Sequence, residues 1–205
     1  MPRTYRMGAR AEAAEATRDR VVHAARDLLV EEGFHRMSVD AVAARADVAR
    51  ATVYQRFGSK AGLLEAVLVD LEGRAGLAGL AELVATAPPD RLVAEVVTAG
   101  CRYWATDPDL CRMILAVATA DPATASVLRD HDAGRRTLLQ QVVARLGHSG
   151  DAADEALDVL WVLTSFDAFD LLSRDHRAAA ERLTTMALRS LPPAANRSGA
   201  AEDPR

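Results

Sequence analysis

Side chains able to bind phosphate groups and nucleic-acid bases gather within eleven residues of this 205-residue chain: Arg50, Thr52, Tyr54, Gln55 and Lys60. An arginine can donate two hydrogen bonds to guanine, and a glutamine can pair in a similar way with adenine. Hydroxyl and ammonium groups are natural ligands of phosphate oxygens, and such contacts fix position rather than sequence. We therefore expect Arg50 at a base edge, Gln55 at a base edge or a phosphate, and the other three side chains at phosphates.

A helix-turn-helix is the element that could hold these side chains together. Ser38 is a suitable N-cap, and apolar residues recur over 39–46 at the spacing of one helical face. Asp47 interrupts that pattern, and we expect a second helix from about Ala49 to Phe57. Gly58 suits the left-handed position at its end. Because the second helix of such a motif enters the DNA major groove with its N-terminal residues at the bases, the segment predicts DNA binding.

The same segment also fits a plain two-helix corner with a solvated polar face. In that interpretation Tyr54 packs against its neighbours rather than recognising a ligand. The local pattern by itself leaves both interpretations open.

The residues around this segment favour the DNA-binding interpretation. The matching positions are Arg20, Ala24, Ala25, Leu28, Gly33, Ser38, Val39, Asp40, Ala43, Val48, Thr52, Val53, Tyr54, Phe57, Ser59, Lys60, Leu63 and Leu64. The run Thr52-Val53-Tyr54-x-x-Phe57-x-Ser59-Lys60 is the most specific part. On these residues, the stretch from about Thr17 to Leu71 resembles the N-terminal DNA-binding domain of the TetR/AcrR family of bacterial transcriptional regulators. The remainder of the chain resembles the family only in length and helical character.

The resemblance implies a role for each matching residue. The candidate DNA-binding residues are Ser38, Arg50, Ala51, Thr52, Tyr54, Gln55 and Lys60. Of these, Thr52, Tyr54 and Lys60 would contact phosphates. The residues at or near base edges would be Arg50, Ala51 and Gln55. The three-helix core would be held by Val39, Val42, Val48, Val53 and Phe57. Ala51 departs from the glycine that is frequent in the family, but alanine still allows a close approach of the backbone.

The composition argues against a membrane-spanning protein, a secreted protein and a disulfide-stabilised protein. Half of the residues are apolar, but no run of 18 residues lacks polar ones, so we expect no transmembrane helix. The first ten residues have no apolar core of the kind that secretory signals carry. Two cysteines, Cys101 and Cys111, argue against a disulfide framework and for a reducing compartment. We therefore expect a cytoplasmic protein.

The net charge of −4 conceals an uneven distribution of charge along the chain. Residues 1–60 carry eleven Lys and Arg against eight Asp and Glu, which gives +3. The remaining residues carry fourteen against twenty-one, which gives −7. A basic front on an acidic body would orient the molecule toward DNA, although the effect is modest.

The helical periodicities predict an all-α fold of about nine helices. They are expected at about 17–32, 39–46, 49–57, 60–72, 91–105, 107–120, 121–146, 152–173 and 176–191. Each Asp-Pro pair at the start of a helix places a capping side chain before a proline at the first helical position. We expect a disordered arm over 1–14, a helix-turn-helix DNA-binding domain over 15–60, a helical effector-binding and dimerisation domain over 61–192, and a disordered tail over 193–205.

The family resemblance suggests two roles for the C-terminal domain besides forming a core. The last two helices would pair with their counterparts in a homodimer through Leu157, Leu160, Ala168, Leu171, Leu172, Leu183, Met186 and Leu191. A small effector, mostly apolar, would bind among Cys101, Trp104, Met113, Leu139, Trp161, Thr164, Phe166 and Phe169. Every one of these side chains also fits plain core packing.

The expected mechanism is that of a repressor. A dimer would bind a palindromic operator near its own gene, and an effector would release it by favouring a different separation of the recognition helices. The five histidines are scattered, and we find no phosphate loop or nucleophile motif, so we expect no cofactor, no metal site and no catalysis. The alternatives are a helical ligand carrier or an adaptor acting through protein contacts, and an activator instead of a repressor.

Overall fold

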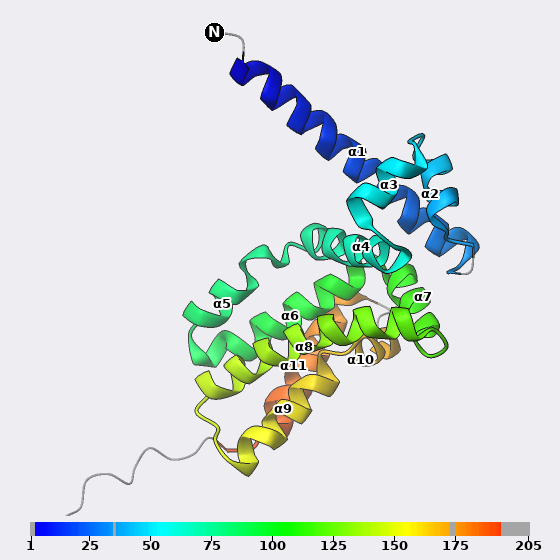
Figure 1. Cartoon of the computed structure of the whole chain (residues 1–205). Coiled ribbons are helices and arrows are strands. Elements are labelled where there is room, and N and C mark those ends of the chain that lie inside the picture. Colours follow the sequence, from blue (N-terminus) through cyan, green and yellow to red (C-terminus); the bar gives the residue numbers. More distant parts are fainter. Residues whose placement is uncertain (1–2, 35, 173–174, 194–205) are drawn as a thin grey trace, which may run out of the picture. The chain divides into compact units, whose positions relative to one another are not determined.

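The structure, a computed structural model, describes residues 3–34, 36–172 and 175–193. Over these ranges it contains eleven α-helices, one 3-10 turn and no β-strand, which confirms the all-α class (Figure 1). The chain divides into two compact units. The described residues up to Arg74 and those of Asp107–Asp130 form the N-terminal unit. Ala75–Thr106 and the described residues from His131 onward form the C-terminal unit.

The N-terminal unit is a cluster of short helices around one long helix. Its elements are α1 (Arg3–Glu32), α2 (Val39–Arg45), α3 (Arg50–Phe57), α4 (Lys60–Arg74), α7 (Pro108–Ala118) and the start of α8 (Pro122–Arg145). Helix α1 packs against α2, α4 and α7, and α3 packs against α2 and α4. The largest fully buried side chains of this core are Val21, Val22, Leu29, Met37, Leu63, Leu64, Leu71 and Leu110.

Helix α1 corrects one expectation. We expected a disordered arm over residues 1–14 and a helix from about Thr17, but the helix begins at Arg3. The added segment is rich in alanine, arginine and glutamate, which have high helix propensity. It lacks an apolar stripe, so the periodicity that reveals packed helices does not reveal this one. Figure 1 shows this half of α1 projecting beyond the helices that α1 packs against.

Asp107 joins three helices of the N-terminal unit. Its side chain is 5% exposed and caps α7 by accepting a hydrogen bond from the Leu110 backbone N–H. Its Oδ2 also accepts from Arg26 Nε of α1 at 2.6 Å and from an Nη of Arg74, at the end of α4, at 3.3 Å. Burial raises the pKa of the Asp107 carboxyl, but the hydrogen bonds and charges of the arginines outweigh it, so the pKa lies below its ordinary value.

The C-terminal unit is built on two long helices. Its elements are η1 (Leu77–Gly79), α5 (Leu80–Thr86), α6 (Pro89–Thr106), the rest of α8, α9 (Asp151–Leu163), α10 (Phe166–Leu172) and α11 (His176–Ser190). Helix α11 packs along α6 and also contacts α9 and α10. The core includes Leu92, Val97, Leu139, Val142, Leu160 and Leu183.

The helix count exceeds the expected nine for two reasons. The segment 77–86, left without a helix in the sequence analysis, forms η1 and α5. The helix expected over 152–173 is interrupted, because Ser165 caps a new helix by accepting a hydrogen bond from the Ala168 N–H at 3.2 Å. The capping role of the Asp-Pro pairs is confirmed at Asp107 and at Asp121, which accepts from the Thr124 N–H at 2.7 Å.

The compact units do not follow the linear division into 15–60 and 61–192. Helices α4 and α7 pack with α1, so the N-terminal unit takes in residues beyond 60. The division therefore remains a prediction about function. Of the expected tail, residues 194–205 lie outside the described residues.

No single helix in the described ranges is long and apolar enough to cross a lipid bilayer. Helices α7 and α8 pass that test only as a pair, by length and composition, and they are broken by a bend of 119°.

Candidate nucleic-acid interface

The turn between α2 and α3 fixes the geometry of the motif. Ser38 caps α2, because its Oγ accepts a hydrogen bond from the Ala41 N–H at 3.1 Å. Asp47 follows α2 with a positive φ of 52°, and the next N–H, that of Val48, donates to the Ala43 carbonyl at 3.0 Å. Aspartate tolerates this left-handed conformation better than most residues. One residue in that conformation lets the chain reverse and begin α3.

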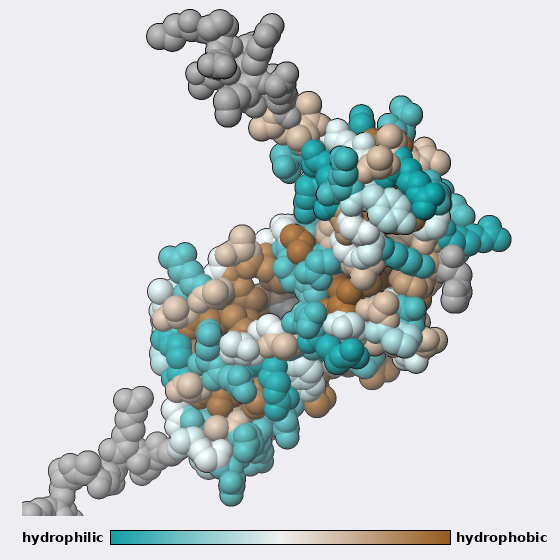
Figure 2. Space-filling view, viewed as in Figure 1, coloured by the Kyte–Doolittle hydropathy of each residue, from teal (hydrophilic) through white to brown (hydrophobic). Residues whose placement is uncertain are grey.

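Helix α3 presents one face to the core and another to solvent. Val53 is buried, and Thr52 and Phe57 are half-buried. The exposed residues of α3 are Arg50, Ala51, Tyr54, Gln55 and Arg56. Figure 2 shows mostly hydrophilic side chains over α2 and α3 on the face in view. All three residues expected at or near base edges, Arg50, Ala51 and Gln55, are therefore exposed, as is Tyr54.

Arg50 is held by two neighbours. Its Nε lies 3.0 Å from Oδ1 of Asp40, one helix earlier, and its Nη2 lies 3.5 Å from the Tyr54 hydroxyl. The Tyr54 hydroxyl and the Asp40 charge both raise the pKa of Arg50. The sequence analysis did not identify Asp40 as a partner. Its place in the first turn of α2 gave no sign of a contact to α3.

Lys60 points inward rather than toward solvent. Its Nζ donates to the Phe34 carbonyl at 2.5 Å and lies 3.4 Å from the centre of the Phe34 ring. Burial lowers the pKa of this amine. A phosphate contact of the kind expected from the sequence would require Lys60 to leave Phe34.

The α3–α4 junction is closely packed. Ser59 caps α4, since its Oγ accepts from the Gly62 N–H at 3.1 Å. A Cβ on Gly62 would collide with the carbonyl oxygen of Phe57, the last residue of α3. Only glycine at this position allows α4 to approach the end of the candidate recognition helix so closely.

Comparisons with known proteins agree with this geometry. The model of the bacterial regulatory proteins of the tetR family matches residues 21–67. The uncharacterized HTH-type transcriptional regulator Rv1556 of Mycobacterium tuberculosis (strain ATCC 25618 / H37Rv) is 31% identical over 144 residues. The match covers 66% of this chain and 66% of that protein, just under two thirds of its length. The chain belongs to the TetR family.

Solved structures share the fold of this TetR-family chain. Salmonella enterica GusR superposes with a TM-score of 0.67 at 24% identity, covering 85% of this chain and 95% of that one. NalD, described as the secondary repressor of the MexAB-OprM multidrug efflux pump in Pseudomonas aeruginosa, gives a TM-score of 0.68 at 22% identity, covering 87% and 98%. At these identities the likeness concerns the fold alone.

The expected effector residues fall into both units of the TetR-family chain. Met113 lies on α7 of the N-terminal unit, whereas the others belong to the C-terminal unit. There Trp104 Nε1 donates to the Thr164 carbonyl at 3.0 Å, and its ring centre lies 5.5 Å from that of Phe166. Phe166 lies 6.3 Å from Phe169 by the same measure. Cys101 and Leu139 are buried in the same unit.

Arg135 is a half-buried charge that the sequence analysis missed. Its guanidinium lies 3.6 Å from the centre of the Trp161 ring. Its Nη1 donates to the Trp161 carbonyl and to Thr164 Oγ1, both at 3.2 Å, near the end of α9. Its Nε is buried with no hydrogen-bond partner among the described residues, and burial lowers the pKa of the group. These contacts place a positive charge beside the aromatic cluster.

The residues expected at the dimer interface differ in how far their side chains are exposed to solvent. Leu157, Leu160 and Leu183 are buried within the unit, so they present no surface to a second copy. Leu171 is 86% exposed and Met186 is 48% exposed. The remaining three, Ala168, Leu172 and Leu191, are half-buried. Val162 and Leu188, which the sequence analysis did not name, are 59% and 55% exposed.

Both cysteines are free, buried thiols. Burial raises the pKa of Cys101 to about 11 and that of Cys111 to about 12, so both thiols are protonated at neutral pH. In the described part of the chain, no group of three or more His, Cys, Asp or Glu side chains could hold a metal ion.

Proposed function

We propose that this chain is a DNA-binding transcriptional regulator in which α3 is the recognition helix. The observation that carries the proposal is the exposure of Arg50, Tyr54 and Gln55 on a helix anchored by buried Val53. The family match over 21–67 includes the whole of this helix. The relatives named HTH-type transcriptional regulators support the same role.

On DNA, the side chains of α3 would exchange partners. Arg50 would leave Asp40 and donate to the O6 and N7 atoms of guanine. Gln55 would reach an adenine or a phosphate, and Thr52 and Tyr54 would bind phosphates. Lys60 would exchange the Phe34 carbonyl for a phosphate oxygen. For Arg50 and Lys60 a contact within the protein would be replaced by one to DNA. The base contacts would select the sequence, and the phosphate contacts would fix the position of the helix.

We further propose that the regulator acts as a homodimer on a palindromic site. One small motif reads few base pairs, and two-fold symmetry doubles the contacts. The exposed apolar side chains of Val162, Leu171, Met186 and Leu188 on α9 to α11 supply surface that a second copy would cover. Leu171 at 86% exposure is the most exposed large apolar side chain of the described residues.

We propose repression, with release by a small ligand bound in the C-terminal unit. The description of NalD as a repressor supports this direction, since the two chains share the fold. A ligand releases the operator only by binding the DNA-free conformation more tightly than the bound one. The aromatic cluster of Trp104, Trp161, Phe166 and Phe169 supports a partly apolar ligand.

The test is binding of the purified protein to a labelled duplex from the region flanking its own gene, with a scrambled duplex beside it. Arg50→Ala should weaken specific binding about tenfold or more, because a bidentate base contact is worth that much discrimination. The matched control is Arg182→Ala, which removes an exposed arginine of α11 and should leave affinity unchanged. Affinity should also fall as salt rises, because bound phosphates release counterions.

Equal binding of both duplexes, together with no site enriched from a random-sequence pool, would refute sequence-specific recognition. The ligand-carrier or adaptor alternatives would then take its place.

A further inference from the structure

A groove runs between α6 and α11 of the C-terminal unit and has not been used by the proposed function. Its cavity is about 600 Å³, within the range of sites that bind small molecules. One side is formed by Ala94, Thr98, Cys101 and Arg102 of α6, which share one helical face. The other side is formed by His176, Arg177, Ala180, Glu181, Thr184 and Thr185 of α11.

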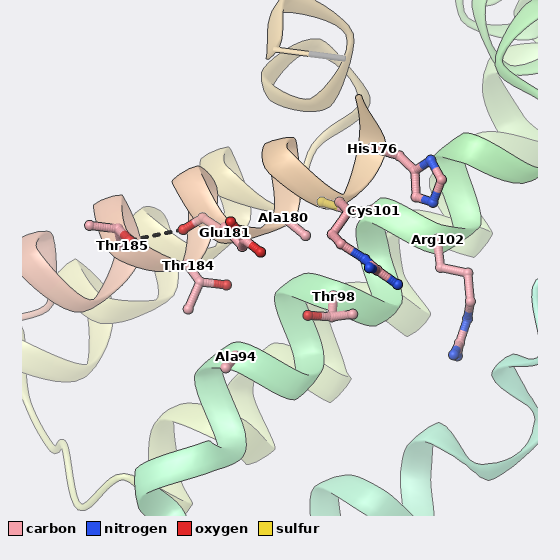
Figure 3. Close-up of a pocket in the computed structure, with 10 residues that line it drawn as sticks. Ala94, Thr98, Cys101, Arg102, His176, Ala180, Glu181, Thr184 and Thr185 are labelled. Atoms are coloured by element: carbon pink, nitrogen blue, oxygen red, sulfur yellow. Dashed lines mark hydrogen bonds between the residues drawn. The ribbon is translucent and has the colours of Figure 1, made fainter. Parts of the chain in front are cut away.

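The two ends of the groove differ in chemistry. Figure 3 shows His176 and Arg102 at one end, and Thr184 and Thr185 at the other. Arg177, the neighbour of His176 in the first turn of α11, also lines the groove. Basic side chains therefore gather at one end and hydroxyl groups at the other.

The basic end has hydrogen-bonding capacity to spare. Arg102 donates one hydrogen bond, at 3.3 Å, to the Gly76 carbonyl. Among the described residues, no carboxylate forms an ion pair with the Arg102 or Arg177 side chain. The nearby Asp175 carboxylate accepts from the Arg177 backbone N–H at 2.9 Å and so caps α11. A guanidinium presents a planar set of donors that matches a carboxylate.

The floor between the ends is made of small side chains. Ala180 and Cys101 are buried there, and Ala94 is half-buried. Burial keeps the Cys101 thiol protonated, so it behaves as a small apolar group. Thr98 and Thr184 face the space between the helices (Figure 3). The floor can therefore accept a narrow, largely apolar chain.

The one carboxylate on the wall limits the class of ligand. Glu181 lies between the two ends, so the lining carries two arginines and a histidine against one acid. From Arg177 to Thr185 the helix rises about 12 Å, at about 1.5 Å for each residue. The space suits an elongated molecule with its negative charge at one end, kept away from Glu181.

We propose that the α6–α11 groove binds small organic carboxylates, with the carboxylate between Arg102 and Arg177 and the chain along Ala94, Cys101 and Ala180. This site differs from the aromatic cluster around Trp104 and takes an anionic ligand rather than a mostly apolar one. Binding is a property of the C-terminal unit. Only an effect of this ligand on DNA binding would rest on the proposed function.

The experiment uses the full chain without DNA and measures binding of octanoate by calorimetry. Octan-1-ol, of the same chain length without charge, and inorganic phosphate, a charge without a chain, are the comparison probes. Octanoate should bind saturably, and each of the other probes should bind at least tenfold more weakly. Because no DNA is present, failure here is distinguishable from failure of the DNA-binding proposal.

Three variants test whether octanoate binds in the α6–α11 groove. Arg177→Ala and Thr98→Leu should each weaken octanoate binding at least tenfold, the first by removing the cation and the second by filling the groove. Arg182→Ala removes an exposed arginine of the same helix outside the groove and should bind as the unmodified protein does. The residues replaced in the three variants are all exposed in the unmodified protein. Unchanged melting curves in circular dichroism would establish that each variant is folded.

Octanoate bound equally well by Arg177→Ala and Thr98→Leu would overturn the proposal. So would octan-1-ol or phosphate binding as tightly as octanoate, or no saturable binding of octanoate.

Discussion

Replacing Asp107 by asparagine should lower the free energy of unfolding by about 2 kcal/mol. Removing one partner of a buried ion pair costs about 3–5 kcal/mol, because the remaining charge is left without compensation. Here the figure is reduced, since Arg26 and Arg74 are about one third exposed and water partly solvates them. Asparagine is also a good N-cap, so the bond from the Leu110 N–H should survive.

The matched control is Asp109→Asn, two residues further along α7. Asp109 is 75% exposed and pairs with Arg112 on its own helix, so its loss should change stability by no more than about 0.5 kcal/mol. Urea unfolding followed by far-ultraviolet circular dichroism at pH 7 gives both values. If Asp107→Asn proves no more destabilising than Asp109→Asn, the buried network does not stabilise the N-terminal unit.

Acid should remove the difference between the unmodified protein and Asp107→Asn. Because the pKa of Asp107 is lower in the folded protein, its stabilising effect is complete above the unfolded value, about 3.9, and is lost as pH falls through the folded value. Unfolding curves at a series of pH values below 5 should therefore converge. A constant difference down to the lowest pH would show that the charge of Asp107 is not responsible.

Two substitutions at backbone-controlled positions give further tests. Gly62→Ala should destabilise the protein by about 1–3 kcal/mol, because its Cβ meets the Phe57 carbonyl oxygen. Gly73→Ala on the same helix has nothing within 4 Å of the added Cβ and should stabilise by up to about 1 kcal/mol; equal effects in thermal melts would contradict this reasoning. Asp47→Gly should be neutral or stabilising, whereas Asp47→Val should cost about 1–2 kcal/mol, because valine is strained at a φ of 52°. Similar melting temperatures for these last two variants would argue against a left-handed residue at the turn.

The local signals of the sequence predicted the helix-turn-helix well. Capping by Ser38, the apolar spacing of α2 and the buried Val53 all depend on neighbours within a few residues. Helix starts at Asp107 and Asp121 were visible for the same reason. Short-range capping and periodicity are encoded locally, so one sequence suffices to read them.

Contacts between distant residues were beyond this kind of prediction. Lys60 bonds to Phe34, 26 positions earlier, and Arg135 lies against Trp161, 26 positions later. Such pairs depend on how helices pack, which periodicity does not specify. The α6–α11 groove was hidden for the same reason, because the residues of its two walls are far apart in the chain.

Lys60 is also a site for selective chemical labelling of the protein. It is the only lysine in the sequence, so its side-chain amine is the only one available to acylating reagents besides the α-amino group. Its half-buried place against Phe34 shields it, although the lowered pKa leaves more of the amine in the nucleophilic form. The rate of acylation at Lys60 therefore reports the state of the α3–α4 junction. The proposed contact of a DNA phosphate with this ammonium should change that rate, so a single labelled peptide in a mass spectrum would test the contact.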